Sequence, residues 1–175
     1  MINKKYKGNF RKWLAYISGI IFILLTLSPE VKAQEDPPRP PSIIQTINLG
    51  FGAFYHGPAG GTVIVDESGG RTTGGGDIVL LGLGYPVSAA HFNIYSNPGT
   101  LINILSIPDF NLTSGANSMK VEIGDSNPDL PFVNNNPYSV PTELTIGAVL
   151  NVGNPTPNPP PGNYNGTFEV TLVME

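Results

Sequence analysis

Short apolar runs alternate with clusters of glycine along residues 49–94. The apolar runs cover 51–54, 62–65, 78–81 and 89–94. Short runs bounded by glycine are typical of strands joined by turns, and no helix pattern, with its period of about 3.6 residues, fits them. The segment therefore predicts a meander of strands.

The glycine-containing stretches 57–61, 67–70 and 74–76 are expected to turn the chain between strands, because glycine adopts positive φ at little cost. A phosphate-binding loop is excluded, since it needs Lys and then Ser or Thr after its last glycine. Asp77 and Ile78 stand there instead. The run 78–81 does not alternate apolar with polar residues, which predicts a strand buried on both faces.

Alternation of apolar and polar residues continues the strand pattern to residue 174. The alternating stretches are 43–49, 91–95, 119–123, 144–152 and 164–174, of which the last is the most regular. The polar stretches 111–117 and 124–141 are rich in turn residues and are expected to be loops. Residues 43–175 are therefore predicted to form one all-β domain, an immunoglobulin-like or Greek-key sandwich of about eight or nine antiparallel strands.

The first 33 residues have the pattern of a secretory signal peptide. A basic start is followed by an uncharged, largely apolar run at 13–27, and then by Val31 and Ala33 at the positions that favour cleavage before Gln34. A retained membrane anchor is the alternative, but a span needs about 20 apolar residues. We expect a bacterial protein secreted to the periplasm or cell surface, with a proline-rich leader at 34–42 and no membrane association after cleavage.

Cleavage would change the charge of the chain. Of nine Lys and Arg residues, six lie in residues 1–33, and of thirteen Asp and Glu residues only Glu30 does. The remainder has a net charge near −9, which disfavours nucleic acid and anionic membranes as partners. The chain has no cysteine, so packing alone must hold the domain.

Catalytic residues are not expected. Nucleophilic catalysis needs a Ser or Cys beside an oriented base, and the two histidines, His56 and His91, have no recognisable partner in the sequence. Their spacing is also unlike that of metal ligands, so neither a metal site nor a cofactor is predicted. The sequence indicates a protein that is not an enzyme.

The stretch 124–141 is the strongest candidate for a binding loop. Asp125, Asn127 and Asp129 carry oxygen ligands of the type that Ca²⁺ prefers, but Leu130 stands where the calcium loop of an EF-hand needs glycine. Asx turns are the alternative role for these side chains. The candidate binding residues are Tyr85, Asp125, Asp129, Phe132 and Tyr138.

Aromatic side chains in or beside loops raise the alternative of a carbohydrate-binding module, because such modules stack sugars on exposed rings. Tyr55 and Tyr164 belong to this group together with Tyr85, Phe132 and Tyr138. The other interpretation is that the rings cover the open ends of a sandwich. The chain after residue 33 has no tryptophan, which favours that second interpretation.

Several motifs occur along the chain in an order that resembles their order in a known family. They are LGFG at 49–52, GGTVIV at 60–65, GGGDIVLL at 74–81, VSAAHFNI at 87–94, GAVLNVGN at 147–154 and GNYNGTFEVTLVME at 162–175. In this order they resemble the bacterial domain-of-unknown-function family 4402. The final motif also resembles the last strand of pilus-subunit and spore-coat-U-like secreted domains. The resemblance implies an exported β-sandwich with surface or appendage associations, and it carries over no catalytic residues.

We therefore expect an exported structural or adhesive domain without catalytic activity, with a carbohydrate-binding module as the alternative. Its partners would be other cell-surface proteins or glycans, or further copies of itself. The candidate assembly strand contains Phe168, Val170 and Leu172. The leader QEDPPRPP lacks the alternating apolar residues of a donor strand, so the domain is expected to be complete in one chain.

Overall fold

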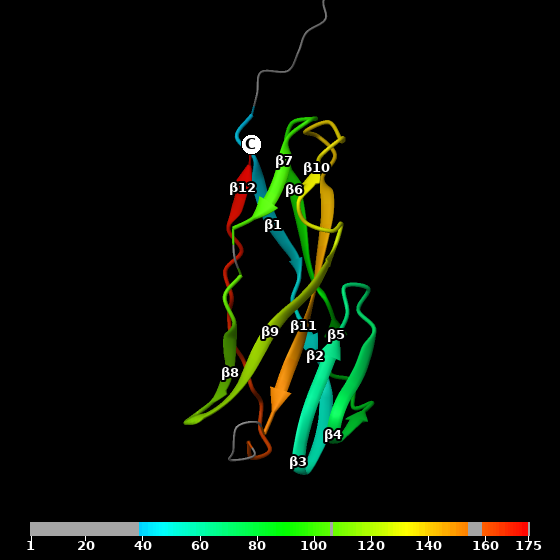
Figure 1. The fold of residues 1–175 in the computed structure, drawn as a ribbon, viewed down its shortest axis with the longest axis vertical. Coiled ribbons are helices and arrows are strands. Elements are labelled where there is room, and N and C mark those ends of the chain that lie inside the picture. The colour runs from blue at the N-terminus through cyan, green and yellow to red at the C-terminus, as the bar shows by residue number, and fades with distance from the viewer. Residues whose placement is uncertain (1–38, 106, 154–158, 175) are drawn as a thin grey trace, which may run out of the picture. The chain divides into compact units, whose positions relative to one another are not determined.

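The computed structural model describes residues 39–105, 107–153 and 159–174. The predicted signal peptide and residues 34–38 of the leader lie outside this part of the chain. The described residues belong to one compact unit, Pro38–Glu175. They form twelve strands and no helix, and so no helix that could cross a membrane, which confirms the all-β prediction (Figure 1).

The strands of the unit are β1 (Ser42–Ile47), β2 (Gly50–Phe51), β3 (Ala53–Val65), β4 (Arg71–Leu81), β5 (Val87–Ser88), β6 (Ala90–Tyr95), β7 (Leu101–Ile104), β8 (Phe110–Ser114), β9 (Asn117–Asn127), β10 (Phe132–Val133), β11 (Thr142–Val152) and β12 (Leu172–Met174). All of the pairings between them are antiparallel. Short strands such as β2, β5 and β10 raise the number above the eight or nine that were expected.

The main sheet has seven strands and is built on β11. Residues 142–146 of β11 pair with β6, and residues 148–152 pair with β3. Residues 145–151 also pair with β9. Because a strand has two edges, β6 and β3 must follow one another along one edge, while β9 takes the other. Beyond them, β1 pairs with β6, β4 with β3, and β8 with β9 (Figure 1).

The sequence of β11 explains its central position. The alternating apolar residues Leu144, Ile146, Ala148, Leu150 and Val152 are all fully buried, as predicted. Gly147 stands on the opposite face, where a Cβ atom would lie 2.6 Å from the carbonyl oxygen of Val65. Glycine is therefore required for the close approach of the β3–β4 turn to this strand.

Two clusters of buried side chains make the core. The first core contains Phe51, Val63, Val65, Met119, Val121, Ala148, Leu150 and Val152. The second core contains Ala90, Phe92, Ile94, Ile102, Leu144 and Ile146. β11 contributes to both cores, and Leu49 packs against both.

Two small sheets complete the unit. One has the order β10-β7-β12, and the other joins β2 to β5. Ile102 of β7 lies in the second core with side chains of β6 and β11, so that core is enclosed between the main sheet and the three-stranded sheet. The immunoglobulin-like connectivity stays a prediction.

The glycine clusters turn the chain, as predicted, although they lie inside the long strands β3 and β4. Residues 57–61 lie within β3 and residues 74–76 within β4, where the pairing of the two strands shifts register. A Cβ atom on Gly76, whose φ is 72°, would collide with the carbonyl oxygen of Gly60. Arg71, the partner of Val65, reaches the carbonyl oxygens of Ala53 and Leu81 at the opposite ends of β3 and β4. Both strands therefore fold back at these glycines, and the hairpin itself turns at 66–70, as expected.

The prediction for residues 78–81 was also wrong. They belong to β4, an edge strand of the main sheet, and Val79 is 54% exposed. Ile78 and Leu80 pack against the first core, whereas Val79 lies on the other face beside Tyr55, its partner on β3. Because Val79 is apolar although it is exposed, residues 78–81 show no alternation of apolar and polar residues.

Two predicted loops are partly strands. Residues 111–117 form the hairpin of β8 and β9, which turns at Gly115 with a φ of 60°. Residues 124–127 extend β9, and residues 132–133 form β10. These polar stretches had no apolar period, but β11 and β7 offer them backbone partners, such as Thr145 for Asn127.

Candidate functional site

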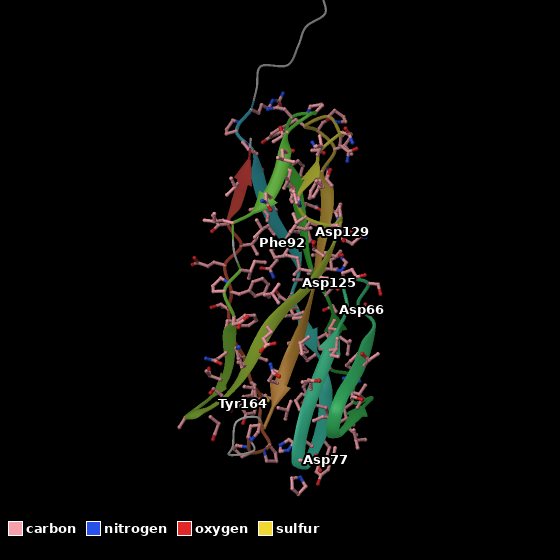
Figure 2. All side chains as sticks on the ribbon, in the orientation of Figure 1. Asp66, Asp77, Phe92, Asp125, Asp129 and Tyr164 are labelled. Carbon is pink, nitrogen blue, oxygen red and sulfur yellow. The ribbon has the colours of Figure 1, made fainter. Side chains whose placement is uncertain are left out.

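The five predicted binding residues do not form one site. Tyr85 lies between β4 and β5 and is 57% exposed. Asp125 is exposed on β9, and Asp129 is exposed in the connection that follows it (Figure 2). Phe132 packs against the second core, and Tyr138 is half-buried near the leader. The residues are therefore divided among separate surfaces and the core.

Tyr138 holds the leader against the unit. Its hydroxyl donates to the carbonyl oxygen of Pro40 at 3.0 Å, and the guanidinium carbon of Arg39 lies 5.2 Å from the centre of its ring. The ring of Tyr95 packs on it at 6.2 Å between centroids. Asn97 also donates to the carbonyl oxygen of Arg39 at 3.1 Å. This tyrosine is thus engaged with the chain itself.

The stretch 132–142 is organised by Asn134, which the sequence analysis did not single out. Asn134 is 1% exposed, and its amide donates to the carbonyl oxygens of Ser96 and Asn136. Its side-chain oxygen accepts hydrogen bonds from the hydroxyl of Thr142 at 2.7 Å and from the backbone N–H of Asn136. The asparagine-rich composition was a signal for such a turn, but which asparagine is buried depends on the fold.

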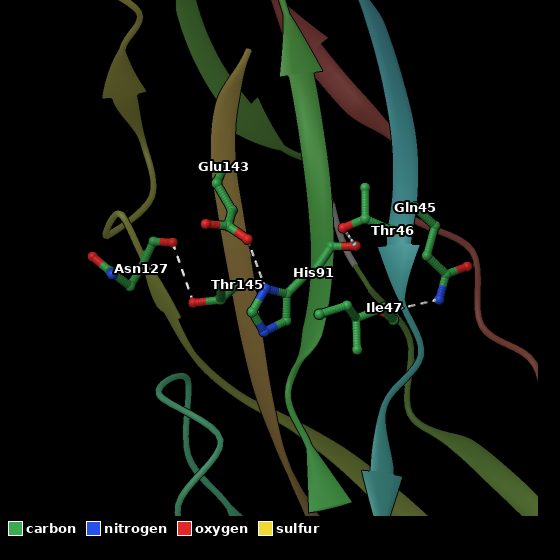
Figure 3. A network of polar contacts seen from close by, with 7 residues as sticks. All are labelled: Gln45, Thr46, Ile47, His91, Asn127, Glu143 and Thr145. Atoms are coloured by element: carbon green, nitrogen blue, oxygen red, sulfur yellow. Dashed lines mark hydrogen bonds and ion pairs between the residues drawn. The ribbon is translucent and has the colours of Figure 1, made fainter. Parts of the chain in front are cut away.

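His91 lies on the polar face of β6, as the alternation predicted. Its Nδ1 is 2.7 Å from Oε1 of Glu143 on β11 (Figure 3). Around this pair, Thr46 of β1 donates to the carbonyl oxygen of His91, and Thr145 donates to that of Asn127. The network ties four neighbouring strands together, and the nearby hydroxyls are bound to backbone oxygens.

His56 joins β3 to the start of the C-terminal part of the chain. Its Nε2 lies 2.8 Å from the carbonyl oxygen of Pro159, and its Nδ1 lies 3.1 Å from that of Gly57. A neutral imidazole carries one N–H and donates to one of these carbonyls at a time. The described residues contain no group of three or more His, Cys, Asp or Glu side chains that could hold a metal ion.

Arg71 fastens the beginning and end of the β3–β4 hairpin to β2. Its guanidinium donates to the carbonyl oxygens of Phe51 at 2.9 Å, Ala53 at 3.0 Å and Leu81 at 3.2 Å. Gly52, with a φ of 66°, leaves the space that the guanidinium fills, because a Cβ atom there would collide with Nη1. The positive charge of Arg71 is therefore directed into the unit.

The turn of the same hairpin is held by Asp66. Its carboxylate accepts hydrogen bonds from the hydroxyl of Ser68 at 2.6 Å and from the backbone N–H groups of Gly70 and Ser68. The hydrogen bond from the Ser68 hydroxyl, followed by that from Gly70, lowers the pKa of Asp66 below its ordinary value of 3.8.

Exposed apolar side chains gather at the β3–β4 end of the main sheet. Tyr55 is 62% exposed beside Val79, and Leu83 and Tyr85 follow in the connection after β4. The outer edge of β4 has no partner strand among the described residues. An unpaired edge presents N–H and C=O groups that can pair with another chain. We call Tyr55, Val79, Leu83, Tyr85 and the outer edge of β4 the edge surface.

The candidate assembly strand lies in residues 164–174, which we call the C-terminal segment. Phe168 and Val170 pack against the second core. Tyr164, which is labelled in Figure 2, packs against the first. Leu172 begins β12 and pairs with Ile104 of β7. The alternation therefore predicted the inward face of this segment correctly at Tyr164, Phe168 and Val170, although regular strand structure covers only Leu172–Met174.

The fold defines an all-β domain with an unpaired outer edge of β4 among the described residues and a C-terminal segment whose side chains pack against both cores. The chain belongs to the family described as Domain of unknown function (DUF4402), whose model matches residues 42–173. This confirms the family resemblance drawn from the sequence motifs. The likeness to pilus-subunit and spore-coat-U-like domains stays a prediction. No curated protein and no solved structure matches the chain.

Proposed function

We propose that the protein is an exported bacterial structural or adhesive domain that contacts other chains through its sheet edges, at the cell surface or in the periplasm. The signal-like residues 1–33 support export. The observation that carries the proposal is the edge surface, where the outer edge of β4, which has no partner strand among the described residues, adjoins four exposed apolar side chains.

The charges of β4 do not protect this edge from pairing. Natural edge strands commonly carry exposed charges that discourage association. In β4 the Arg71 guanidinium is bound to three carbonyl oxygens, and the Asp77 carboxylate accepts the N–H of Ala59 at 3.3 Å. The strand therefore offers backbone groups together with the apolar face of Val79 and Tyr55.

The proposal is tested by placing a charge on the edge surface of the exported protein. We expect Val79→Lys to weaken adhesion or self-association at least about tenfold, since a lysine on an edge strand opposes strand pairing. Val140→Lys is the matched control, because Val140 is a similarly exposed valine that lies outside the strands, between β10 and β11. Equal binding by both variants and the original chain would contradict the proposal, as would retention of the chain in the cytoplasm. Sequencing the N-terminus of the exported protein should find Gln34 first.

A carbohydrate-binding module is the second candidate, and the exposed rings of Tyr55 and Tyr85 favour it. A sugar ring stacks on an aromatic face, so Tyr55→Ala and Tyr85→Ala would abolish binding to a glycan array. Val79→Leu keeps an apolar side chain beside Tyr55 and would leave glycan binding intact. Binding of no glycan by the original chain would remove this candidate.

A further inference from the structure

The C-terminal segment has few backbone hydrogen bonds for its length. At its start, Asn165 and Thr113 of β8 exchange two hydrogen bonds, of 2.8 and 3.1 Å. At its end, β12 pairs with β7, and the N–H of Leu105 donates to the carbonyl oxygen of Thr171 at 3.1 Å. Between these points, residues 166–170 make no backbone hydrogen bond within the part of the chain that the structure describes.

Side chains hold the middle of the segment instead. The ring of Phe168 stacks on Phe110 of β8 at 5.1 Å between centroids and meets Phe92 of β6 edge to face at 6.3 Å. Tyr164 fills a place beside the first core, and Val170 a place beside the second. Gly166 lets the segment approach β8, because a Cβ atom there would lie 2.5 Å from the carbonyl oxygen of Asn111. The segment is thus a row of inserted side chains with attachments at its two ends.

A short exposed connection precedes the segment. Residues 160–163 (PPGN) are all exposed, whereas Pro159 is buried and its carbonyl oxygen faces His56 of β3. The hydroxyl of Tyr164 donates to the carbonyl oxygen of Pro160 at 2.8 Å. The unit therefore has a fixed point at Pro159, a solvent-exposed link of four residues, and then the inserted segment.

We infer that the C-terminal segment exchanges between two copies of this chain. In the exchanged form, Tyr164, Phe168 and Val170 of one copy occupy the places beside the two cores of the other copy. The link at 160–163 acts as the hinge. Every contact of the segment is recreated in the exchanged form, so only the hinge and the new contacts between copies distinguish the two states energetically. This inference rests on the proposed structural role, for which it names a second copy of the chain as the partner.

The partner is a second copy because the place that the segment occupies fits this segment. Along this place, Tyr164 packs against the first core, and Phe168 and Val170 pack against the second. Gly166 leaves room for the close approach to β8. Reciprocal exchange gives a closed dimer, and one-way exchange gives an open chain of copies.

Engineered cysteines test the exchange directly, because the natural chain contains none. Thr113 and Asn165 are exposed partners across the bridge between β8 and the segment, so replacing them preserves the core. Purified Thr113→Cys and Asn165→Cys proteins are unfolded together in urea, refolded and oxidised. Exchange brings one cysteine of each protein together in a single bridge and yields a mixed disulfide dimer.

We expect the mixed dimer to exceed a control pair by at least about tenfold, since paired residues react at an effective concentration in the millimolar range. The control mixes Asn165→Cys with Thr72→Cys, an exposed residue of β4. A yield no greater than that of the control would overturn the exchange. The double variant Thr113→Cys/Asn165→Cys supplies a second test, since oxidation before mixing should lock each copy closed and abolish dimers seen by light scattering. Dimers that persist in the locked protein when it also carries Val79→Lys, which weakens association through the edge surface, would also overturn it.

The result is independent of the proposed function. A chain that never exchanges but loses adhesion through Val79→Lys would overturn the inference and leave the proposed function standing. A chain that exchanges its C-terminal segment but is never exported would support the inference and contradict the proposed function.

Discussion

β11 and the C-terminal segment have similar sequences but are held in the unit in different ways. Apolar residues recur at every second position over nine residues in β11 and eleven in the C-terminal segment. β11 pairs with three strands and buries its apolar side chains completely. The C-terminal segment has backbone partners at its two ends, and its side chains Tyr164, Phe168 and Val170 are only partly buried. Alternation therefore determines which side chains face the core, whereas the neighbouring strands determine the backbone pairing.

The largest loss of stability is expected from truncation in β11. Leu150 is fully buried in the first core, so Leu150→Ala should lower the free energy of unfolding by about 3 to 4 kcal/mol through lost burial and a residual cavity. Urea denaturation measures this change. The matched control is Leu105→Ala, at a leucine that is 73% exposed, and it should change stability by less than about 0.5 kcal/mol. Similar losses in both variants would contradict the central role of β11.

Truncation in the C-terminal segment should cost less and should act on the segment itself. Phe168 is half-buried, so Phe168→Ala should lower the free energy of unfolding by about 2 kcal/mol. Because the segment is held by its side chains, the same variant should speed proteolysis within residues 160–174. Phe168→Leu, which keeps apolar contact with Phe92 and Phe110, should show a smaller effect in both measurements. Proteolysis unaffected by the alanine variant would contradict this view of the segment.

Arg71 provides a third region for comparison. Its hydrogen bonds join β4 to β2 and to the start of β3, and the alternation of apolar and polar residues does not predict these contacts. Arg71→Lys keeps the charge but cannot reach the carbonyl oxygens of Phe51, Ala53 and Leu81 together. We expect a loss of about 1 to 2 kcal/mol in urea denaturation. Thr72→Ser, at the exposed neighbouring residue, should have no measurable effect, and an equal loss there would contradict the role of the guanidinium.

The smallest expected effect is the pH dependence of the hairpin turn. The pKa of Asp66 is lower in the folded protein than its ordinary value of 3.8, so the ionised carboxylate stabilises the fold above that value. This stability is lost as the pH falls through the folded pKa. Asp66→Asn should therefore be less stable than the original chain at pH 7, and the difference should shrink below pH 3.8. A difference that is constant with pH, measured by urea denaturation, would contradict the assignment.

The sequence predicted the all-β class and most inward-facing residues of the long strands, because both depend on local alternation, and the order of its motifs predicted the family. It failed where contacts distant in sequence decide the structure. The polar residues of β8 and of the end of β9 form strands because β8 pairs with β9 and β9 pairs with β11. The glycines of β3 and β4 turn the chain as predicted, but the sequence did not show that β3 and β4 pair with each other on both sides of these turns.

The candidate site was predictable only in part for the same reason. The inward direction of Phe168 and Val170 follows from period two, and the structure agrees. The edge position of Val79 could not be recognised, since an apolar residue on an exposed face has the same sequence signal as a buried one. Asn134 was hidden among similar asparagines, because its burial depends on the loop at 96–100 that it binds.

Native-state hydrogen exchange, measured by NMR on the purified protein, tests the contrast between β11 and the C-terminal segment most directly. We predict that the amides of residues 166–170 exchange at least about a hundredfold faster than those of residues 147–151, because residues 166–170 have no backbone partners among the described residues and open without unfolding the core. Equal protection of the two stretches would mean that the segment is as firmly paired as β11. That result would contradict both the account of the segment and the ease with which it is proposed to exchange.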